Sequence, residues 1–222
     1  MDWTALWLSV RLATATTLVL LAIGVPLAYW IVFSPRRWKF LVEAIVALPL
    51  VLPPTVLGFY VLVALGPLSP VGRAYARIAG HGLPFTFEGL LIASVLYSMP
   101  FAVQPFSTEF ASVDRRLLEA SWTLGASRVE TFRRIVLPLS VRGLVTGMVL
   151  SFAHTLGEFG VVLMVGGNLP GVTRTVSISI YDAVESLDYA SASRTSLLLL
   201  VVSFVILATT YGLQRSAWIK PR

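Results

Sequence analysis

Residues 12–33 read LATATTLVLLAIGVPLAYWIVF, an uninterrupted run of 22 residues without a charged side chain. A helix needs about 20 predominantly apolar residues to cross the hydrocarbon core of a bilayer. The run is too long for the apolar part of a secretory signal peptide, and a single basic residue, Arg11, precedes it. We therefore interpret Leu12–Phe33 as a retained membrane-spanning helix.

Four further stretches meet the same length criterion, and three of them also lack charged residues. They are Ala44–Leu65, Gly89–Thr108, Gly143–Val165 and Thr195–Leu213. The sequence thus predicts an all-α integral membrane protein with about five transmembrane helices. We expect one transmembrane domain over residues 1–222, located in the cell membrane.

The composition agrees with a bilayer environment. Hydrophobic residues make up 56% of the chain, charged residues 13%, and the mean hydropathy is +0.82. Soluble domains carry about 25% charged residues. The chain has no cysteine, which excludes disulfides, Fe–S clusters and thiolate zinc sites, and its two histidines, His81 and His154, are too few for a His-rich metal site. We expect no metal and no cofactor.

The positions of Lys and Arg predict the orientation, because loops on the cytoplasmic side are enriched in these residues. One set of alternate segments holds Arg36, Arg37, Lys39, Arg115, Arg116, Arg128, Arg133, Arg134, Arg142, Arg215, Lys220 and Arg222. The opposite set holds Arg11, Arg73, Arg77, Arg174 and Arg194. We expect the N-terminus outside, the C-terminus inside, segments 34–43 and 109–142 in the cytoplasm, and segments 66–88 and 166–194 outside. The net charge of +6 then reflects topology, and no nucleic-acid partner is expected.

The second span contains the run LPLVLPP, residues 48–54, with three prolines. Each proline removes a backbone donor and bends a helix, and such breaks are tolerated where neighbouring helices or a water-filled path satisfy the freed carbonyls. The run should therefore leave several carbonyl groups without helical partners near the membrane interface.

One face of the fourth span combines small and ionisable residues. At 100° per residue, it holds Gly143, Gly147, Ser151, His154 and Glu158. A G-x-x-x-G pattern lets helices approach closely, so Gly143 and Gly147 should form a helix contact. Intramembrane ionisable groups face a bundle interior or an aqueous cavity, so His154 and Glu158 are either a buried pair that fixes packing or a pore or gate position. Catalysis is not expected, because no nucleophile or third partner stands nearby.

The most polar segment outside the spans is 112–142, which we expect to form a helical hairpin. Asp114 can N-cap a first helix that ends before Gly125. Ser127 begins the pattern S-x-x-E of a capping box, and the second helix should stop at Pro138. The second helix would place three apolar residues on one side: Val129, Phe132 and Val136.

A pattern of fixed spacing runs through this hairpin. Its residues are Glu119, Ala120, Ser121, Gly125, Ile135, Leu137 and Pro138. The pattern resembles the cytoplasmic signature of permeases in binding-protein-dependent ABC importers: Glu-Ala-Ala, three residues, Gly, nine residues, Ile, one residue, Leu-Pro. Ser121 in place of the second alanine is the one departure. The resemblance implies that these residues form coupling helices, which dock in a cleft of a separate ATPase subunit.

Three other segments resemble molybdate permeases. They are LPLVLPPTVLG at residues 48–58, LGEFG at residues 156–160 and GNLPGVTRT at residues 167–175. Sulfate permeases are similar in parts of these segments, although they are usually longer with a sixth span, and tungstate permeases are a further near neighbour. The resemblance implies import of an oxyanion, with molybdate first and tungstate or sulfate as alternatives. The candidate residues for the translocation path or gate are His154, Glu158, Phe159, Gly160, Asn168 and Arg174.

Apolar residues recur at helical spacing after the fourth span, at Val176, Ile180, Val184 and Leu187. They predict an amphipathic helix over Thr175–Leu187 at the outer surface. Such a helix could lie in the interface, receive a substrate-binding protein, or form part of an outer gate, and these alternatives stay open.

The resemblance also implies partners and a mechanism. Two copies of this chain would form a homodimer around a central path, with cytoplasmic ABC ATPase subunits below, an extracytoplasmic oxyanion-binding protein above, membrane lipid around it, and alternating access as the mode of transport. The chain should not hydrolyse ATP itself, because a P-loop needs Lys followed by Ser or Thr, whereas its two lysines precede Phe40 and Pro221. A secondary transporter is the main rival, although no internal repeat is evident and Glu158 is the single acid deep in a span. An intramembrane enzyme lacks its catalytic constellation, and a channel would not explain the signature.

Overall fold

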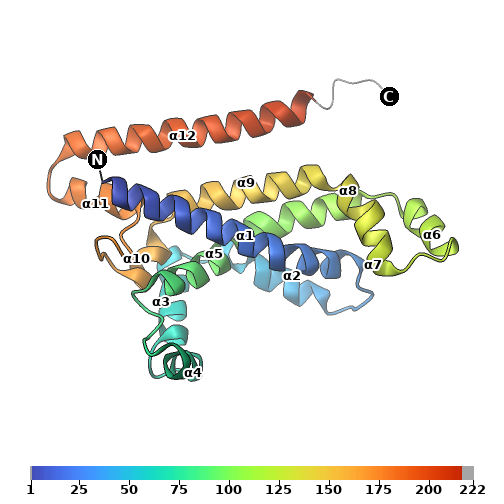
Figure 1. Cartoon of the computed structure of the whole chain (residues 1–222), viewed down its shortest axis with the longest axis horizontal. Coiled ribbons are helices and arrows are strands. Elements are labelled where there is room, and N and C mark those ends of the chain that lie inside the picture. Colours follow the sequence, from blue (N-terminus) through green and yellow to red (C-terminus); the bar gives the residue numbers. More distant parts are fainter. Residues whose placement is uncertain (1, 217–222) are drawn as a thin grey trace.

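The structure, a computed structural model, describes residues 2–216, so Lys220 and Arg222, which contribute to the predicted charge asymmetry, lie outside the described residues. Every regular element in this range is helical (Figure 1). Three helices are long and apolar enough to cross a membrane by themselves: α1 (Trp3–Phe33), α5 (Phe87–Ser112) and α12 (Tyr189–Ser216).

Two bent pairs of helices raise the number of candidate spans to five. In the first pair, α2 (Lys39–Ala47) and the short helix η1 (Leu48–Leu50) meet α3 (Pro54–Leu65) at 113°. In the second, the segment Arg128–Leu139 meets α9 (Val141–Gly157) at 72°. The predicted all-α fold with about five candidate spans is therefore confirmed, whereas the orientation of the termini stays a prediction.

The predicted fourth span over Gly143–Val165 is not one continuous helix. Helix α9 ends at Gly157, the chain is extended at Glu158, and α10 (Gly160–Gly166) begins after it. The second predicted span is also interrupted, between Leu50 and Pro54. Both interruptions are short, so each stretch remains apolar enough to be assigned as a span from its sequence.

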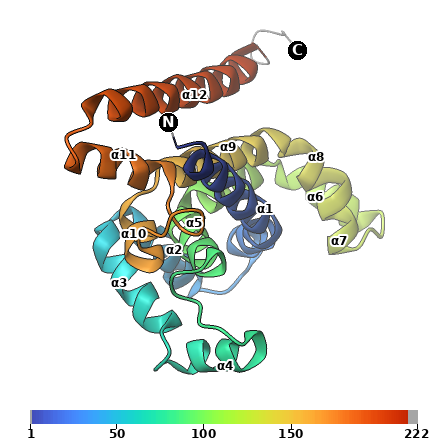
Figure 2. The same ribbon diagram turned by 60° about the vertical axis from the view of Figure 1, so that its left-hand side comes forward.

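Helices α1, α5 and α9 pack against one another and form the core of the bundle. Leu20, Val103, Phe106 and Phe110 are almost completely buried between them. Helix α10 packs against α3 and α5, whereas α12 contacts α9 and α11 (Val176–Glu185) and stands apart from the rest (Figure 2). A short helix, α4 (Pro70–Ala79), lies across the direction of the long helices.

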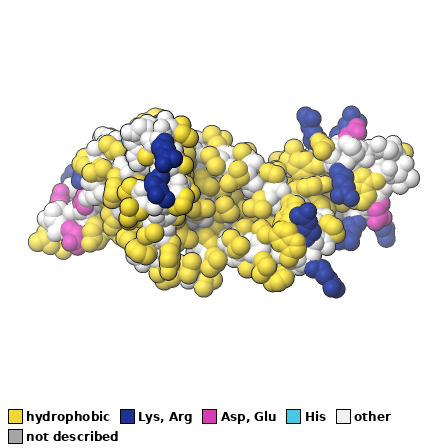
Figure 3. Space-filling view, turned by 90° about the horizontal axis from the view of Figure 1, so that it is seen from below, with side chains coloured by type: hydrophobic (Ala, Val, Ile, Leu, Met, Phe, Trp, Pro, Cys, Tyr) yellow, Lys and Arg dark blue, Asp and Glu magenta, His cyan; other side chains and the backbone are white. Residues whose placement is uncertain are grey.

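The two ends of the bundle differ. One end, here called the hairpin end, carries α6 (Arg115–Thr123), α7 (Arg128–Thr131), η2 (Phe132–Val136) and α8 (Leu137–Leu139); the other, the α11 end, carries α10 and α11. Lys and Arg side chains gather at the hairpin end, and hydrophobic side chains cover the middle of the molecule (Figure 3). This arrangement matches a protein that exposes its middle to lipid.

Candidate functional site

The hairpin is built by the capping residues that its sequence predicts. Asp114 accepts a hydrogen bond from the Arg116 backbone N–H at 2.9 Å and begins α6. Gly125 follows α6 with φ +85°, a left-handed conformation that favours glycine. The Ser127 hydroxyl accepts from the Glu130 N–H at 3.2 Å and begins α7.

Ser121, the departure from the importer signature, connects the two arms of the hairpin. Its hydroxyl lies 2.9 Å from the hydroxyl of Thr131, which is buried and itself donates to the Ser127 carbonyl at 3.0 Å. Ser121 is therefore the donor to Thr131. The small residue at this position joins α6 to α7 by a hydrogen bond that alanine would lack.

The second arm of the hairpin does not stop at Pro138, as the sequence suggested. The five residues Phe132–Val136 form a π-helix, and the helix then continues to Leu139 before the bend at Ser140. Proline has no N–H and its ring clashes with the carbonyl four residues earlier, and a wider π turn accommodates this clash. Val129 is exposed, whereas Val136 is buried, and Val129 lines an apolar pocket together with Phe132 and residues of α1 such as Pro26 and Tyr29.

A groove of about 500 Å³ runs between the arms. Four signature residues line it: Ala120, Ser121, Gly125 and Ile135. Leu117 and Leu124 are exposed beside it, with Leu124 at 88%, and an ion pair between Arg134 and Glu130 at 3.2 Å stands on its rim. Glu119 is exposed on α6, whereas Ile135 and Leu137 pack against the bundle core. An apolar groove with a charged rim can receive a helix or loop of another protein.

The break between α9 and α10 is organised by Glu158. Its carboxylate is buried and accepts a hydrogen bond from the Val161 N–H at 2.7 Å, one of the free donors at the start of α10. Gly160 lies against Pro54, and Gly58 lies against Val161 and Met164, so α10 and α3 approach closely. The two breaks, and with them two of the segments that resemble molybdate permeases, therefore meet.

His154 does not pair with Glu158. Its Nδ1 lies 2.9 Å from the Ser98 hydroxyl, which also lies 2.8 Å from the Thr155 hydroxyl, and its ring stacks on Phe101 with centroids 3.9 Å apart. No hydrogen bond or ion pair joins His154 to Glu158 in the described part of the chain, so the interpretation as a mutual pair is wrong. The rest of this face behaves as a helix contact, since a Cβ at Gly143 or Gly147 would overlap side chains of α5.

Asn168 and Arg174 belong to a polar cluster at the α11 end. The Asn168 amide donates to both carboxylate oxygens of Asp182 at 2.8 and 2.7 Å, and the Arg174 Nε donates to the Asn168 carbonyl oxygen at 2.6 Å. The Arg174 guanidinium also lies 3.3 Å from the Asp182 carboxylate. Arg174 is therefore not an unpaired cation, and this cluster holds the loop after α10 against α11.

Helix α11 is two residues shorter at its C-terminal end than the amphipathic helix predicted over Thr175–Leu187. Thr175 is its N-cap, and it ends at Glu185. Its buried apolar residues are Val176 and Ile178, whereas Val184 and Leu187 are exposed. Leu187 lies beyond the helix, in a left-handed turn toward α12. Phe159 reaches this helix, with its ring 5.0 Å from that of Tyr181.

The candidate residues thus form two groups, not one site. The signature residues lie in the hairpin, while Glu158, Phe159, Gly160, Asn168 and Arg174 lie toward the α11 end (Figure 1). Sequence reasoning missed Asp182, Ser98 and Thr131, each of which holds one of the predicted residues. Of these three residues, Asp182 was the one that the sequence could have indicated, because it is an acid on a predicted outer helix near Arg174.

Comparison with known proteins identifies the type of chain. Residues 21–218 match the family described as binding-protein-dependent transport system inner membrane component. The molybdenum transport system permease protein ModB of Azotobacter vinelandii is 47% identical over 96% of this chain and 95% of its own length. ModB of Escherichia coli K12 is 32% identical over 96% of this chain and 94% of its own length.

Solved structures show the same fold at low sequence identity. An inward-facing structure of the MetNI methionine ABC transporter has a TM-score of 0.72 at 16% identity and covers 96% of this chain and 94% of that chain. A bacterial alginate ABC transporter in complex with an alginate pentasaccharide-bound periplasmic protein has a TM-score of 0.77 at 18% identity, covering 99% of this chain and 80% of that chain.

Proposed function

The chain belongs to the family of inner membrane components of binding-protein-dependent transport systems, and we propose that it is the permease of an ATP-driven molybdate importer. The observation that carries the substrate is the 47% identity to a ModB protein along nearly the whole chain. Membership of this family argues against a secondary transporter. Because this chain has no P-loop, the ATPase is a separate subunit in this proposal.

The hairpin groove is the proposed docking site for that ATPase. It combines exposed apolar residues with a charged rim, at the end of the molecule where Lys and Arg gather. Glu119 is exposed nearby on α6, where it lines a neighbouring pocket with Arg115 and Trp122. Basic residues favour the cytoplasmic side, where ATP is found. In this proposal the chain works as a homodimer by alternating access, and an extracytoplasmic oxyanion-binding protein docks at the α11 end.

The substrate is tested by uptake of labelled molybdate into cells that lack their own molybdate permease and express this chain with its partner subunits. We expect uptake that survives an uncoupler while ATP is maintained. Excess unlabelled tungstate or sulfate is the competitor. Transport of sulfate in preference to molybdate would overturn the substrate and leave the permease assignment in place.

The docking site is tested by co-purification of the ATPase with Glu119→Ala and Gly125→Val. Loss of a hydrogen-bonded charge at an interface costs about 1–3 kcal/mol, or roughly a 5- to 150-fold loss of association. Valine at Gly125 must adopt φ +85°, which costs about 1–2 kcal/mol locally.

Matched controls separate docking from general damage. Gly80 has a similar φ of +77° and, like Gly125, space for a side chain, but it lies at the end of α4; Glu185 is exposed on α11. Gly80→Val and Glu185→Ala should leave association unchanged. Wild-type association of both hairpin variants would contradict the docking site.

A further inference from the structure

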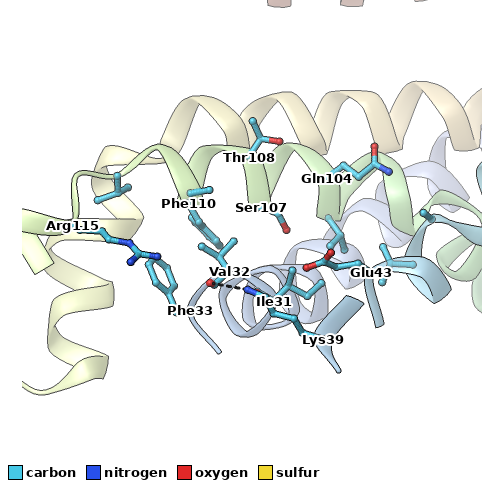
Figure 4. Close-up of a pocket in the computed structure, with 15 residues that line it drawn as sticks. Ile31, Val32, Phe33, Lys39, Glu43, Gln104, Ser107, Thr108, Phe110 and Arg115 are labelled. Carbon is cyan, nitrogen blue, oxygen red and sulfur yellow. Dashed lines mark hydrogen bonds between the residues drawn. The ribbon is translucent and has the colours of Figure 1, made fainter. Parts of the chain in front are cut away.

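A cleft of about 600 Å³ opens near the hairpin end between the end of α1, α2 and α5 (Figure 4). It shares no lining residue with the hairpin groove, although its Arg115 begins α6, the first arm of the hairpin. Much of its wall is apolar, formed by residues such as Ile31, Val46, Val103 and Phe110. In a membrane-spanning chain, a side cleft with such a wall fits a hydrocarbon chain better than a hydrated ion.

Charged groups of both signs stand around this apolar wall. Lys39 donates from its ammonium to the Ile31 carbonyl at 2.9 Å and to the Val32 carbonyl at 3.4 Å, which holds it over the C-terminal end of α1. An ammonium has three N–H donors, so one remains for a ligand. Arg115 lines the same cleft, and its side chain makes no hydrogen bond or ion pair with the described residues.

Glu43, one turn after Lys39 on α2, supplies acceptors, and Ser107 on α5 supplies a hydroxyl. Glu43 lies on α2 and lines the cleft, and its carboxylate has no hydrogen-bond or ion-pair partner within residues 2–216. The Ser107 hydroxyl oxygen is buried and also without a partner in this part of the chain. Figure 4 shows the Ser107 and Glu43 side chains directed into the cleft, with the Lys39 ammonium at its floor.

This combination of charges decides the ligand. The apolar wall offers no polar partner to a hydrated oxyanion, so the cleft favours an anion that also carries a hydrocarbon chain. Two cations suit a phosphate, and the carboxylate suits an ammonium that can donate hydrogen bonds. We propose that the cleft binds a phospholipid whose head group carries both a phosphate and a primary ammonium, with a fatty-acyl chain against the apolar wall.

In this arrangement Lys39 and Arg115 contact the phosphate, Glu43 accepts from the ammonium, and Ser107 donates to an ester carbonyl. The basic end of the molecule is where phospholipid head groups meet the chain, because the hydrophobic middle ends there. The proposal is independent of the transported substrate, since none of these residues belongs to the hairpin groove or to the break at Glu158.

The test is native mass spectrometry of the purified full chain with its partner subunits, titrated with phosphatidylethanolamine, phosphatidylcholine or phosphatidylglycerol of identical acyl chains. Phosphatidylcholine keeps the charges of phosphatidylethanolamine but has no ammonium N–H, and phosphatidylglycerol has no ammonium. We expect phosphatidylethanolamine to be retained about two- to fivefold more than either, the factor of an ion pair at a partly exposed site.

Two variants assign the contacts. Glu43→Ala should remove the preference for phosphatidylethanolamine over phosphatidylcholine, because it removes the acceptor of the ammonium N–H, whereas Lys39→Gln should weaken retention of both lipids. Glu185→Ala, which removes an exposed carboxylate at the α11 end, is the control and should change neither. Equal retention of the three lipids by the wild-type protein, or a preference that persists in Glu43→Ala, would overturn the proposal.

Discussion

Each of the two broken spans interrupts the helical hydrogen bonds of its backbone, and the two breaks limit the number of unpaired backbone groups in different ways. Between η1 and α3, prolines remove backbone donors, so that the break leaves fewer N–H groups to satisfy. Between α9 and α10, the donors remain and Glu158 supplies a buried acceptor for one of them. Unpaired backbone groups are costly inside a bilayer, and the two solutions are to omit the donor or to add an acceptor.

The two breaks are also one structural unit, because the segments that follow them pack together. Pro54 at the start of α3 meets Gly160 at the start of α10, and Gly58 meets Val161 and Met164 one turn later. The break that contains prolines thus lies beside the break that contains the Glu158 carboxylate. We expect the close contact between α3 and α10 to contribute most to stability, the Glu158 acceptor less, and the prolines least.

The largest effect is expected from Gly160→Leu, which fills the contact between the two breaks. A Cβ at this position would lie 2.6 Å from the Pro54 Cβ, and overpacking of this kind costs about 1–3 kcal/mol or more. We expect a strong loss of folded protein in thermal unfolding monitored by size-exclusion chromatography. Gly157→Leu is the matched control, since a Cβ there has no such neighbour within 4 Å; equal loss in both variants would show that the contact is not the cause.

The acceptor at the second break is tested by replacing Glu158. Glu158→Ala leaves the buried Val161 N–H without its partner, which costs about 1–3 kcal/mol, whereas Glu158→Gln keeps an acceptor oxygen and should assemble nearly normally. Assembly is measured by yield and thermal stability, and transport by molybdate uptake. If the carboxylate lines the path, Glu158→Gln lowers uptake more than assembly; an equal loss of both assigns it a structural role alone.

A smaller effect is expected where the loop after α10 is held by charge. Arg174→Glu places a carboxylate beside Asp182 and should cost about 1 kcal/mol, because the pair is partly exposed. The exchange Arg174→Glu with Asp182→Arg should recover thermal stability if the cluster only holds the loop. Recovery of stability without recovery of uptake would give Arg174 a role in docking or anion access.

The smallest effect is expected from Pro53→Ala at the first break. The substitution restores one N–H, and the Pro49 carbonyl four residues earlier is the partner it would find in a continued helix. We expect a change below about 1 kcal/mol in thermal stability, since alanine can keep the observed backbone. A loss of stability as large as that of Glu158→Ala would show that proline at the first break matters as much as the acceptor at the second.

Much of this fold is readable in the sequence because it depends on local chemistry. The span count follows from apolar length, and the hairpin from Asp114, Gly125 and Ser127, whose capping roles involve neighbours within a few residues. The break at Glu158 was hidden because Gly160–Gly166 is as apolar as the helix before it. Periodicity at 100° per residue assumes a continuous helix, so it placed Glu158 on the face of His154 where the chain in fact turns away.

The site was less predictable because its contacts join distant segments. Ser98 lies 56 residues from His154 and Asp182 lies 14 residues from Asn168, and no local pattern connects them. The resemblance to importers proposed Glu119 and Gly125 as coupling residues without any of this geometry, and their role stays a prediction. It could not foresee that Ser121, a variation within the signature, bonds to Thr131.

The isolation of α12 has a consequence for how the protein is made. Its described contacts are with α9 and α11, and its side chains are mostly exposed along the span, so the layers between α1, α5 and α9 are complete without it. A ribosome releases the earlier helices first, and they can reach their final neighbours while α12 is still being synthesised. The insertion machinery therefore has a finished bundle to hand over, and α12 can enter the lipid as a late addition without any rearrangement of what preceded it.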